Sequence, residues 1–456
     1  MRKKSNNDLT VGSPYKSIVN FAIPILIGSL LQQAYNITDS AIVGRFIGIE
    51  ALAGVGSTGS LNFLVIGFVI GTCTGFGIPI SQSYGSNNIA DLKKYFAHAI
   101  YLAAFISIVL TITVLIFLRP ILVLMNTTDE MMPYAYTYIS TIFMGIAGMY
   151  LYNLLAAVLR AIGNSKTPLF FLICSAGVNL ILDLIFVIGL QIGVLGTALA
   201  TVISQTASGI ACIILINKKV HLLQTTKKDW IFDFAYIKKL FSLGVPMGLQ
   251  FSITAIGSVI LQSAVNSLGT IYAASISAGS KISGFAIKPL ETLGLAMATF
   301  AGQNLGAGKL DRISKGLKQS VLIGFAYSVV TFIVIFFTGE YLALILVSAD
   351  EVDAIANIQL FLLFNMAALP INTLLHIFRN TIQGLGYSAV AMFAGVMELF
   401  ARVFVAFGLI GLLGYTGSVL ANPVAWGSAV IFLVPTYFII MKKLRKKNTV
   451  ATIGHP

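Results

Sequence analysis

The chain has 456 residues, of which 57% are hydrophobic and only 10% are charged. Soluble proteins carry about 25% charged residues. This composition, with a mean hydropathy of +0.91, therefore excludes a soluble globular protein and indicates an integral membrane protein. The formal net charge of +13 raises the question of a nucleic-acid partner, but the positions of the charges account for it without one.

Segments of about 20 apolar residues, the length that an α-helix needs to cross a bilayer, recur along the whole chain. They predict an all-α integral membrane protein with twelve transmembrane helices. The approximate bounds are 15–43, 52–82, 95–118, 131–158, 168–190, 195–217, 237–266, 272–302, 316–338, 354–381, 387–411 and 417–440. The amino terminus, MRKKSNNDLT, lacks a small-residue cleavage site after a short apolar core, so we expect the first helix to be retained.

Lysine and arginine residues gather on one side of this arrangement. If both termini are cytoplasmic, 24 of the 29 Lys and Arg residues lie on the cytoplasmic side, Arg379 among them, and only Arg45 and Arg119 lie on the opposite side. Cytoplasmic loops carry such an excess of basic residues. We therefore predict a multi-pass protein of the plasma membrane with both termini in the cytoplasm and no nucleic-acid partner.

A weak internal repeat relates the two halves of the chain at an offset of about 221 residues. Gln82-Ser-Tyr-Gly matches Gln303-Asn-Leu-Gly, and Arg160-Ala-Ile-Gly matches Gln383-Gly-Leu-Gly after small insertions. Six helices per half is an even number, so both halves have the same orientation in the membrane. We expect two six-helix bundles that form a substrate cavity and rock to give alternating access. The expected domains are 1–217, a cytoplasmic linker at 218–239, and 240–456.

Two acidic residues at membrane depth in the first half have no basic residue in their own segments. A charge at the centre of a membrane helix costs about 2.5 to 3.5 kcal/mol, so each should face a cavity or a partner. Gln32, Asn36 and Asp39 share one face of the first helix, and Asn179 and Asp183 share one face of the fifth.

Both acids are expected in the outer half of the membrane, and Thr201 on the sixth helix lies at a depth where its hydroxyl can join them. We predict a shared ion site at Asp39, Asp183, Asn179 and Thr201, with Gln32, Asn36 and Asn153 lining the approach of the substrate. The structural alternatives are a helix-end residue for Asp39, a hydrogen-bonded buried acid for Asp183, and interhelical packing bonds for the polar residues.

The second half carries charges that pair by spacing. Lys288 and Glu291 are three residues apart, and Glu398 and Arg402 are four residues apart, while Lys281 has no such partner. Neutralised pairs are less costly to bury, so a structural ion-pair network is one interpretation. The repeat counterparts of Asp39 and Asp183 are apolar (Ile260 or Leu261, and Phe404), so unpaired acid is confined to the first half.

Enzyme motifs are absent from the sequence. Cys73, Cys174 and Cys212 fall in predicted helices without metal-ligand spacing, and we interpret them as small buried residues. The segment AGQNLGAGKLDR departs at two positions from a phosphate-binding loop, because Gln303 and Leu310 replace the required Gly and Ser or Thr. We predict neither an enzyme nor a bound cofactor.

Several segments resemble the multidrug and toxic compound extrusion (MATE) transporters, over nearly the whole chain. They are IPILIGSLLQQAYNITDSAIVGRFIGIEALAGVG, LRAIGNSKTPLFF with NLILDLIFVIGLQIGVLGTALAT, and FAGQNLGAGK. The resemblance implies export of amphipathic, usually cationic organic compounds, driven by inward flow of protons or sodium ions. In the DinF-like branch the coupling acids fall on Asp39 and Asp183, beside Asn179 and Thr201. The NorM-like branch also uses acids in its second bundle, and this chain has none from residue 234 to 290 or from 354 to 397.

We therefore expect a secondary antiporter that exports small organic cations, acts as a monomer in the lipid bilayer, and binds a proton or possible sodium ion at Asp39 and Asp183. An alternative is a flippase for lipid-linked oligosaccharides, since Lys281, Lys288 and Arg402 offer basic groups for a pyrophosphate. A membrane enzyme and a channel have less support. The sequence leaves open which compounds are carried and whether the coupling ion is sodium or a proton.

Overall fold

The computed structural model describes residues 8–453, with side chains to residue 448, and all regular structure in this range is helical. Nine helices in this range are long and apolar enough to cross a membrane. Two further spans are broken helices, bent by 51° and 49°. The twelfth is Thr270–Gly306, whose 37 residues include Lys281, Lys288 and Glu291. The twelve predicted helices are thus confirmed. Thr270–Gly306 differs from the other spans by its three charged residues.

The first half contains eight α-helices and one π-helix. They are α1 (Pro14–Phe46), α2 (Ile49–Ser57), α3 (Gly59–Gly85), α4 (Ile89–Leu124), α5 (Met132–Met144), α6 (Ile146–Ala161), α7 (Lys166–Asp183), η1 (Leu184–Gly189) and α8 (Val194–Lys219). Two short 3-10 helices follow, η2 (His221–Leu223) and η3 (Lys227–Trp230).

The second half repeats this order of elements. They are α9 (Phe234–Asn266), α10 (Thr270–Gly306), α11 (Leu310–Ala343), α12 (Val352–Ala367), α13 (Leu369–Gly384), α14 (Ser388–Phe404), the π-helix η4 (Val405–Leu409), α15 (Ile410–Leu413), α16 (Tyr415–Val419) and α17 (Ala421–Ile453).

The backbone of both halves shows the repeat that the sequence predicts. A π-helix follows α7 in the first half and α14 in the second. Residues with positive φ recur in pairs at the repeat offset: Gly48 and Gly269 (132° and 118°), Asn87 and Gly308 (62° and 69°), Gly163 and Gly386 (88° and 89°), and Gly193 and Gly414 (64° and 57°). Residues other than glycine rarely adopt these backbone φ angles. Their recurrence therefore shows that both halves make the same turns. The doubled architecture is confirmed.

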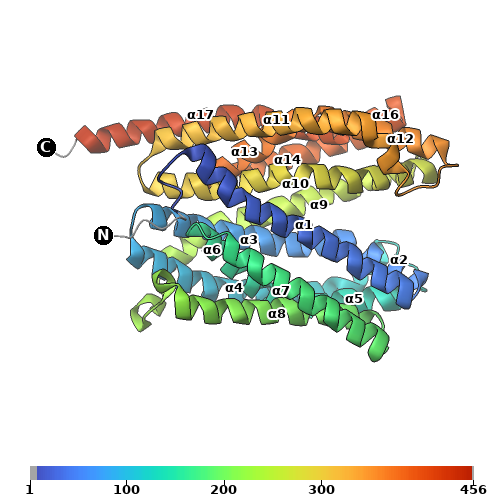
Figure 1. Ribbon diagram of the computed structural model, residues 1–456, viewed down its shortest axis with the longest axis horizontal. Helices are drawn as coiled ribbons and strands as arrows, with labels where there is room; N and C mark the ends of the chain where they lie inside the picture. The colour runs from blue at the N-terminus through green and yellow to red at the C-terminus, as the bar shows by residue number, and fades with distance from the viewer. Residues whose placement is uncertain (1–7, 454–456) are drawn as a thin grey trace. The chain divides into compact units, whose positions relative to one another are not determined.

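The described residues form two compact units, one of residue 8 with 23–248 and one of residues 9–22 with 249–453. The division falls inside the long helices α1 and α9 and not within 218–239. In the first unit α6 packs on α3 and α8, and α7 lies beside α8 (Figure 1). In the second unit α10 packs on α13, and α14 packs on α17.

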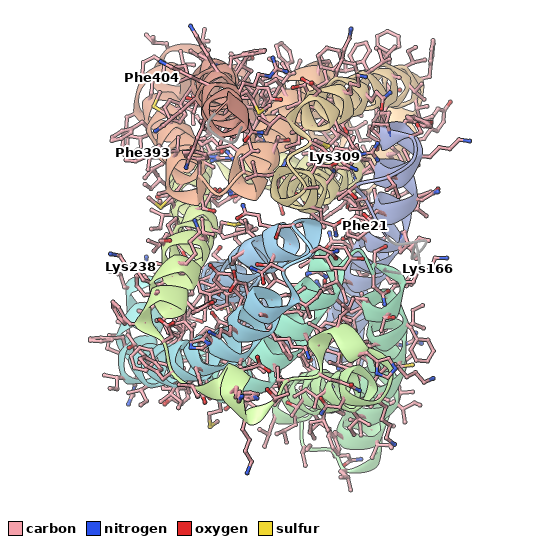
Figure 2. All side chains as sticks on the ribbon, turned by 90° about the vertical axis from the view of Figure 1, so that its left-hand side faces the viewer. Phe21, Lys166, Lys238, Lys309, Phe393 and Phe404 are labelled. Carbon is pink, nitrogen blue, oxygen red and sulfur yellow. The ribbon has the colours of Figure 1, made fainter. Side chains whose placement is uncertain are left out.

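Large apolar side chains cover the outer surfaces of single helices, as expected where helices face lipid. On α14, Phe393 and Phe404 are 55% and 60% exposed and point away from the helix (Figure 2). Cys174 on α7 is also exposed, so the prediction that all three cysteines are buried is wrong for this residue. Exposure to lipid carries no cost for such weakly polar side chains.

Two glycine pairs bring α3 and the first part of α9 into close contact within the first unit. Gly71 and Gly75 are four residues apart on α3, as Gly244 and Gly248 are on α9. A Cβ on Gly75 would lie 2.5 Å from the Gly244 Cα, and one on Gly71 would lie 2.5 Å from the Met247 carbonyl oxygen. Membrane helices lack a hydrophobic driving force for association, so small residues at such positions let the backbones pack closely.

We expect Gly75→Val to lower the melting temperature of the detergent-solubilised protein, because the added side chain meets backbone that cannot move aside. Overpacking of this kind costs about 1–3 kcal/mol or more. Gly177→Val on α7 is the matched control, since nothing lies within 4 Å of a Cβ at that position. Equal melting temperatures for the two variants would show that the glycine contact does not stabilise the first unit.

The segment 218–239, predicted as a linker, is folded onto α4 of the first unit. The Tyr101 hydroxyl donates to the Trp230 carbonyl oxygen (3.0 Å), and the Asp233 N–H donates to His98 Nε2 (2.9 Å). A capping box starts η3, in which Asp229 Oδ2 accepts from the Thr226 N–H (2.6 Å) and from its hydroxyl (2.8 Å). The segment is therefore an ordered part of the first unit and not a free tether.

The capping box perturbs Asp229. Burial raises the pKa of its carboxyl group, but the hydrogen bonds from Thr226 and the nearby Lys93 and Lys94 outweigh burial and hold the pKa below its usual value. A depressed pKa in the folded state contributes stability above the unfolded value, about 3.9, and that contribution is lost as the pH falls through the folded value.

We therefore expect Asp229→Asn to lower the melting temperature at neutral pH, and the difference from the parent protein to shrink as the pH falls below about 4. Thermal unfolding measured across a pH series tests this. A difference that stays constant down to pH 3 would mean that the charge of Asp229 does not contribute.

Candidate ion and substrate site

Three helices of the first unit bring polar side chains together at membrane depth. The Thr201 hydroxyl on α8 donates to the Thr197 carbonyl oxygen (3.1 Å). It also accepts from Asn179 Nδ2 on α7 (3.3 Å) and lies 2.9 Å from the Tyr35 hydroxyl on α1. With its proton directed to Thr197, the Thr201 oxygen accepts from both neighbours. One threonine therefore links α1, α7 and α8.

Asp39 and Asp183 lie beside this link. Asp39 is one helical turn beyond Tyr35 on α1, and Asp183 is one turn beyond Asn179 at the end of α7. Both Asn179 and Asp183 are fully buried. The two carboxyl groups lie close enough to interact with each other, and the Tyr35 hydroxyl lies near the Asp39 carboxyl group. The structure thus brings together the four residues predicted as an ion site.

Several oxygen atoms at this place have no hydrogen-bond partner. Among the described residues they include both carboxyl oxygens of Asp183, Oδ1 of Asp39 and Oδ1 of Asn179. No Lys or Arg of the described chain forms an ion pair with either acid. A buried acceptor without a donor is costly. The oxygens therefore favour a proton or a small cation at this place.

The chemistry of the donors suits a proton or sodium ion better than a transition metal. Carboxylate, amide and hydroxyl oxygens are ligands for hard cations, whereas zinc and copper prefer imidazole and thiolate. Within the described part of the chain, no group of three or more His, Cys, Asp or Glu residues has the geometry to hold a metal. Asp39 and Asp183 supply two acidic ligands, and neutral oxygens would complete the shell.

A π-helix begins directly after Asp183. In η1 (Leu184–Gly189) the backbone hydrogen bonds join residues five apart, and not four as in an α-helix. Such segments occur often at functional sites. The equivalent π-helix η4 follows Phe404 in the second half, where the preceding residue is an exposed aromatic. The backbone feature therefore belongs to the repeated fold, and the buried acid in front of it is specific to the first half.

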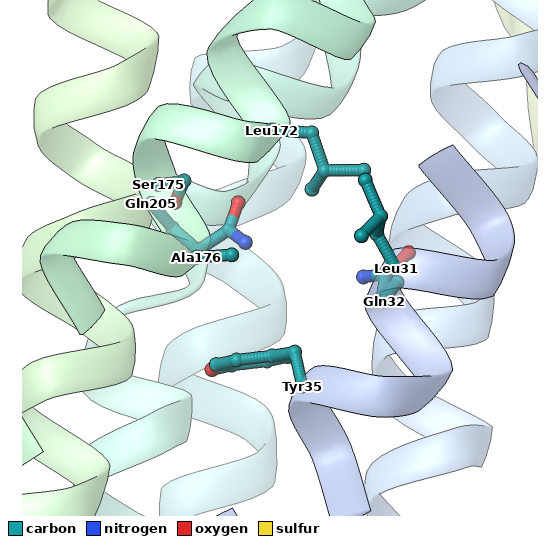
Figure 3. A pocket seen from close by; sticks show the side chains of 7 residues that line it. All are labelled: Leu31, Gln32, Tyr35, Leu172, Ser175, Ala176 and Gln205. Carbon is teal, nitrogen blue, oxygen red and sulfur yellow. The ribbon is translucent and has the colours of Figure 1, made fainter. Parts of the chain in front are cut away.

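An open pocket next to the acids is lined by α1, α7 and α8 (Figure 3). It is shallow and partly open to the surroundings, and its enclosed volume, about 10 Å³, is that of about one water molecule. Its lining residues are Leu31, Gln32, Tyr35, Leu172, Ser175, Ala176 and Gln205. Its lining is mixed, with apolar side chains from α1 and α7 and polar groups from all three helices.

Of the residues predicted to line the substrate approach, Gln32 lies in this pocket, whereas Asn36 and Asn153 are not among its lining residues. Asn36 is exposed on α1, and the Asn153 amide donates to the Met149 carbonyl oxygen of its own helix (2.8 Å).

The sequence reasoning missed Tyr35, Ser175 and Gln205. Each lies four residues from a predicted site residue, Asp39, Asn179 or Thr201 respectively, and therefore on the same helical face. Helical spacing alone was thus a signal that pointed to all three.

Charges of the second unit pair more extensively than their spacing predicts. Lys288 Nζ lies 2.6 Å from Glu291 Oε2, as predicted. Glu398 contacts Arg402, at 3.6 Å, but it also pairs with Arg379 on α13. Arg379 is only 5% exposed and so lies inside the second unit. Lys281 is exposed on α10.

The MatE family model matches residues 24–185 and 246–408, which together cover more than two thirds of the chain. The chain belongs to the MatE family. Each matched segment covers one half of the internal repeat, in agreement with the paired turns of the backbone. The chain is therefore a multi-pass membrane protein of a multidrug efflux transporter family.

Relatives of this MatE protein carry names of drug exporters. It is 29% identical over 346 residues to the "Probable multidrug resistance protein YoeA" of Bacillus subtilis strain 168, covering 74% of this chain and 75% of the relative. It is 22% identical over 440 residues to the "Multidrug export protein MepA" of Staphylococcus haemolyticus strain JCSC1435, covering 96% and 95%.

Its fold is also similar to the solved outward-facing conformation of a multidrug resistance MATE family transporter of the MOP superfamily. The TM-score is 0.90 at 20% identity, over 97% of this chain and 99% of the other.

We expect Thr201→Val to lower the melting temperature of this MatE protein, because it leaves the Tyr35 hydroxyl and the Asn179 amide without their shared acceptor. An unsatisfied buried polar group costs about 1–3 kcal/mol. Thr74→Val on α3 is the control, since the Thr74 hydroxyl bonds only to the Ile70 carbonyl oxygen of its own helix (2.8 Å). A smaller effect at Thr201 than at Thr74 would contradict the role of Thr201 as a link.

Proposed function

We propose that the protein is a secondary antiporter that exports amphipathic, mainly cationic organic compounds in exchange for protons or sodium ions. The coupling ion binds at Asp39 and Asp183, with Asn179 and Thr201 beside them, as the resemblance to the DinF-like branch implies. The exported compound occupies the pocket that Gln32 and Tyr35 line. The two states of the cycle alternate in access to the two sides of the membrane.

The observation that carries this proposal is the pair of neighbouring acids whose buried oxygens have no donor. Two carboxylates that share a low-dielectric site repel each other, and a bound proton or cation relieves the repulsion. An organic cation in the adjoining pocket relieves it as well. The ion and the exported compound therefore compete for one negative site, and this competition couples their movements.

The membrane potential drives such an exchange when one net positive charge moves inward in each cycle, as when two ions enter for each monovalent cation that leaves. Inward movement of one charge provides about 2.3 kcal/mol per 100 mV. At about 1.4 kcal/mol for each factor of ten, this supports roughly fiftyfold accumulation of a compound on the outside.

The proposal also has three cell-level features. They are a place in the plasma membrane with both termini cytoplasmic, a monomeric state, and activity without a bound cofactor. The excess of Lys and Arg on one side supports the orientation.

We expect Asp183→Asn and Asp39→Asn each to abolish ion-driven efflux of a cationic dye from vesicles while the protein still inserts and folds. Each variant keeps the size of the side chain and removes the charge that attracts the ion. Glu50→Gln is the control, because Glu50 is an exposed acid at the start of α2 in the same unit. Efflux by Asp183→Asn at the rate of the parent protein would contradict the assignment.

Gradients imposed one at a time identify the coupling ion in the same vesicles. An inward proton gradient without sodium, or an inward sodium gradient at equal pH, should drive dye efflux in the parent protein and fail in both acid variants. Efflux that needs neither gradient would contradict antiport.

A further inference from the structure

The second unit buries a positive charge that the proposed function does not use. Arg379 on α13 and Arg402 on α14 are each only 5% exposed, and both pair with the same carboxylate, Glu398. Among the described residues neither arginine forms an ion pair with any other acid. Two guanidinium groups and one carboxylate leave a net charge of +1.

Both arginines also have nitrogen atoms without a hydrogen-bond acceptor. Nε of Arg379 and Nη1 of Arg402 are buried and unpaired. The contact between Arg402 Nη1 and Glu398 Oε2 is long, at 3.6 Å. Unpaired donors on a buried cation are costly, and the cost is removed when an anionic oxygen accepts from them.

The second unit holds Arg402 in this position with a small residue. A Cβ added to Gly257 on α9 would lie 3.2 Å from the Arg402 Cδ, so the absence of a side chain at residue 257 gives the arginine its place. The position of Arg379 is fixed by the close packing of its helix, α13, against α10 and α17. The two guanidinium groups are thus fixed by the fold.

A second group of polar residues lies on α10 of the same unit. Lys281, Gly284, Lys288 and Glu291 share one helical face, and a Cβ on Gly284 would meet no atom within 4 Å. Lys288 and Glu291 remain 29% and 41% exposed. His376 on α13 lies within electrostatic range of both Glu291 and Arg379 and so connects this group to the arginine pair. Charged residues on a membrane helix face a hydrated space in preference to lipid.

We propose that the second unit contains an anion-binding site in which Arg379 and Arg402 bind one phosphate or carboxylate group. The group approaches along Lys281 and Lys288. Each guanidinium group has one buried nitrogen without an acceptor, Nε of Arg379 and Nη1 of Arg402, and one oxyanion between them can accept from both. Glu398 competes with the ligand in this site, because its carboxylate pairs with the same two arginines.

The site does not depend on the direction of transport or on the acid pair of the first unit. Its ligand is an anionic oxygen group of a free metabolite or of a lipid headgroup. Loss of ion coupling in Asp183→Asn should therefore leave anion binding unchanged, so a failure of one proposal does not decide the other.

The test measures the melting temperature of the full-length protein in a neutral detergent, with inorganic phosphate titrated against chloride, which has no oxygen acceptor, at constant ionic strength. A ligand that binds only the folded state raises the melting temperature with concentration. We expect phosphate to raise it in the parent protein and in Lys315→Gln, which removes an exposed lysine of α11 in the same unit. Arg402→Gln leaves a neutral Arg379–Glu398 pair and should abolish the rise.

A charge-restoring variant separates binding from a folding defect. Arg402→Gln with Glu398→Gln leaves Arg379 as an unpaired cation, so the net charge returns to +1 and phosphate binding should reappear. Glu398→Gln alone removes the competing acid and should tighten phosphate binding by about tenfold or more, since opposite charges at this separation interact strongly inside proteins.

Nanodiscs distinguish the two sources of the anionic group. If the ligand is a lipid headgroup, phosphatidylglycerol added to phosphatidylcholine discs raises the melting temperature of the parent protein but not of Arg402→Gln, and free phosphate adds nothing further. If the ligand is soluble, phosphate raises it in both lipids. An equal phosphate and lipid response in the parent protein and Arg402→Gln, or no response in either, would overturn the proposal.

Discussion

The low dielectric of the membrane is the constraint on which the rest of this structure depends. Inside the bilayer each backbone group must find its partner within the chain, which leaves helices as the available element. Each charge must likewise find a counter-charge, a hydrated space or a bound ion. The helices, the glycine contacts between them and the positions of a few charged residues all follow from this one condition.

The two halves of the chain meet this condition with the same backbone and different charges. Both contain a broken helix, a π-helix and the same positive-φ turns. The first unit holds Asp39 and Asp183 with buried oxygens that lack a donor, whereas the second buries Arg379 and Arg402 around one glutamate. A duplicated fold therefore carries an acidic place in one copy and a basic place in the other. The charge of the ligand that each copy favours is set by side chains and not by backbone geometry.

Hydrogen bonds between α1, α7 and α8 stabilise the arrangement of helices around Asp39 and Asp183. Thr201 accepts from Asn179 and lies beside the Tyr35 hydroxyl, so three helices share one small oxygen atom. A shift of α1 relative to α8 would break the bond to Tyr35 and displace Asp39, which lies one turn away on the same helix. In the proposed function, an ion bound at Asp39 would therefore be linked to the position of α1.

The sequence by itself determined the number of helices, the doubling of the fold and the local charge pairs. Each of these depends on composition or spacing along the chain, such as the three-residue spacing of Lys288 and Glu291. Only the tertiary structure decided that Arg379 pairs with Glu398, that Tyr35 and Gln205 belong to the site, and that π-helices follow Asp183 and Phe404. These features depend on how separate helices pack. The lipid-facing and protein-facing sides of a membrane helix are both apolar, so the one-dimensional pattern carries little information about its neighbours.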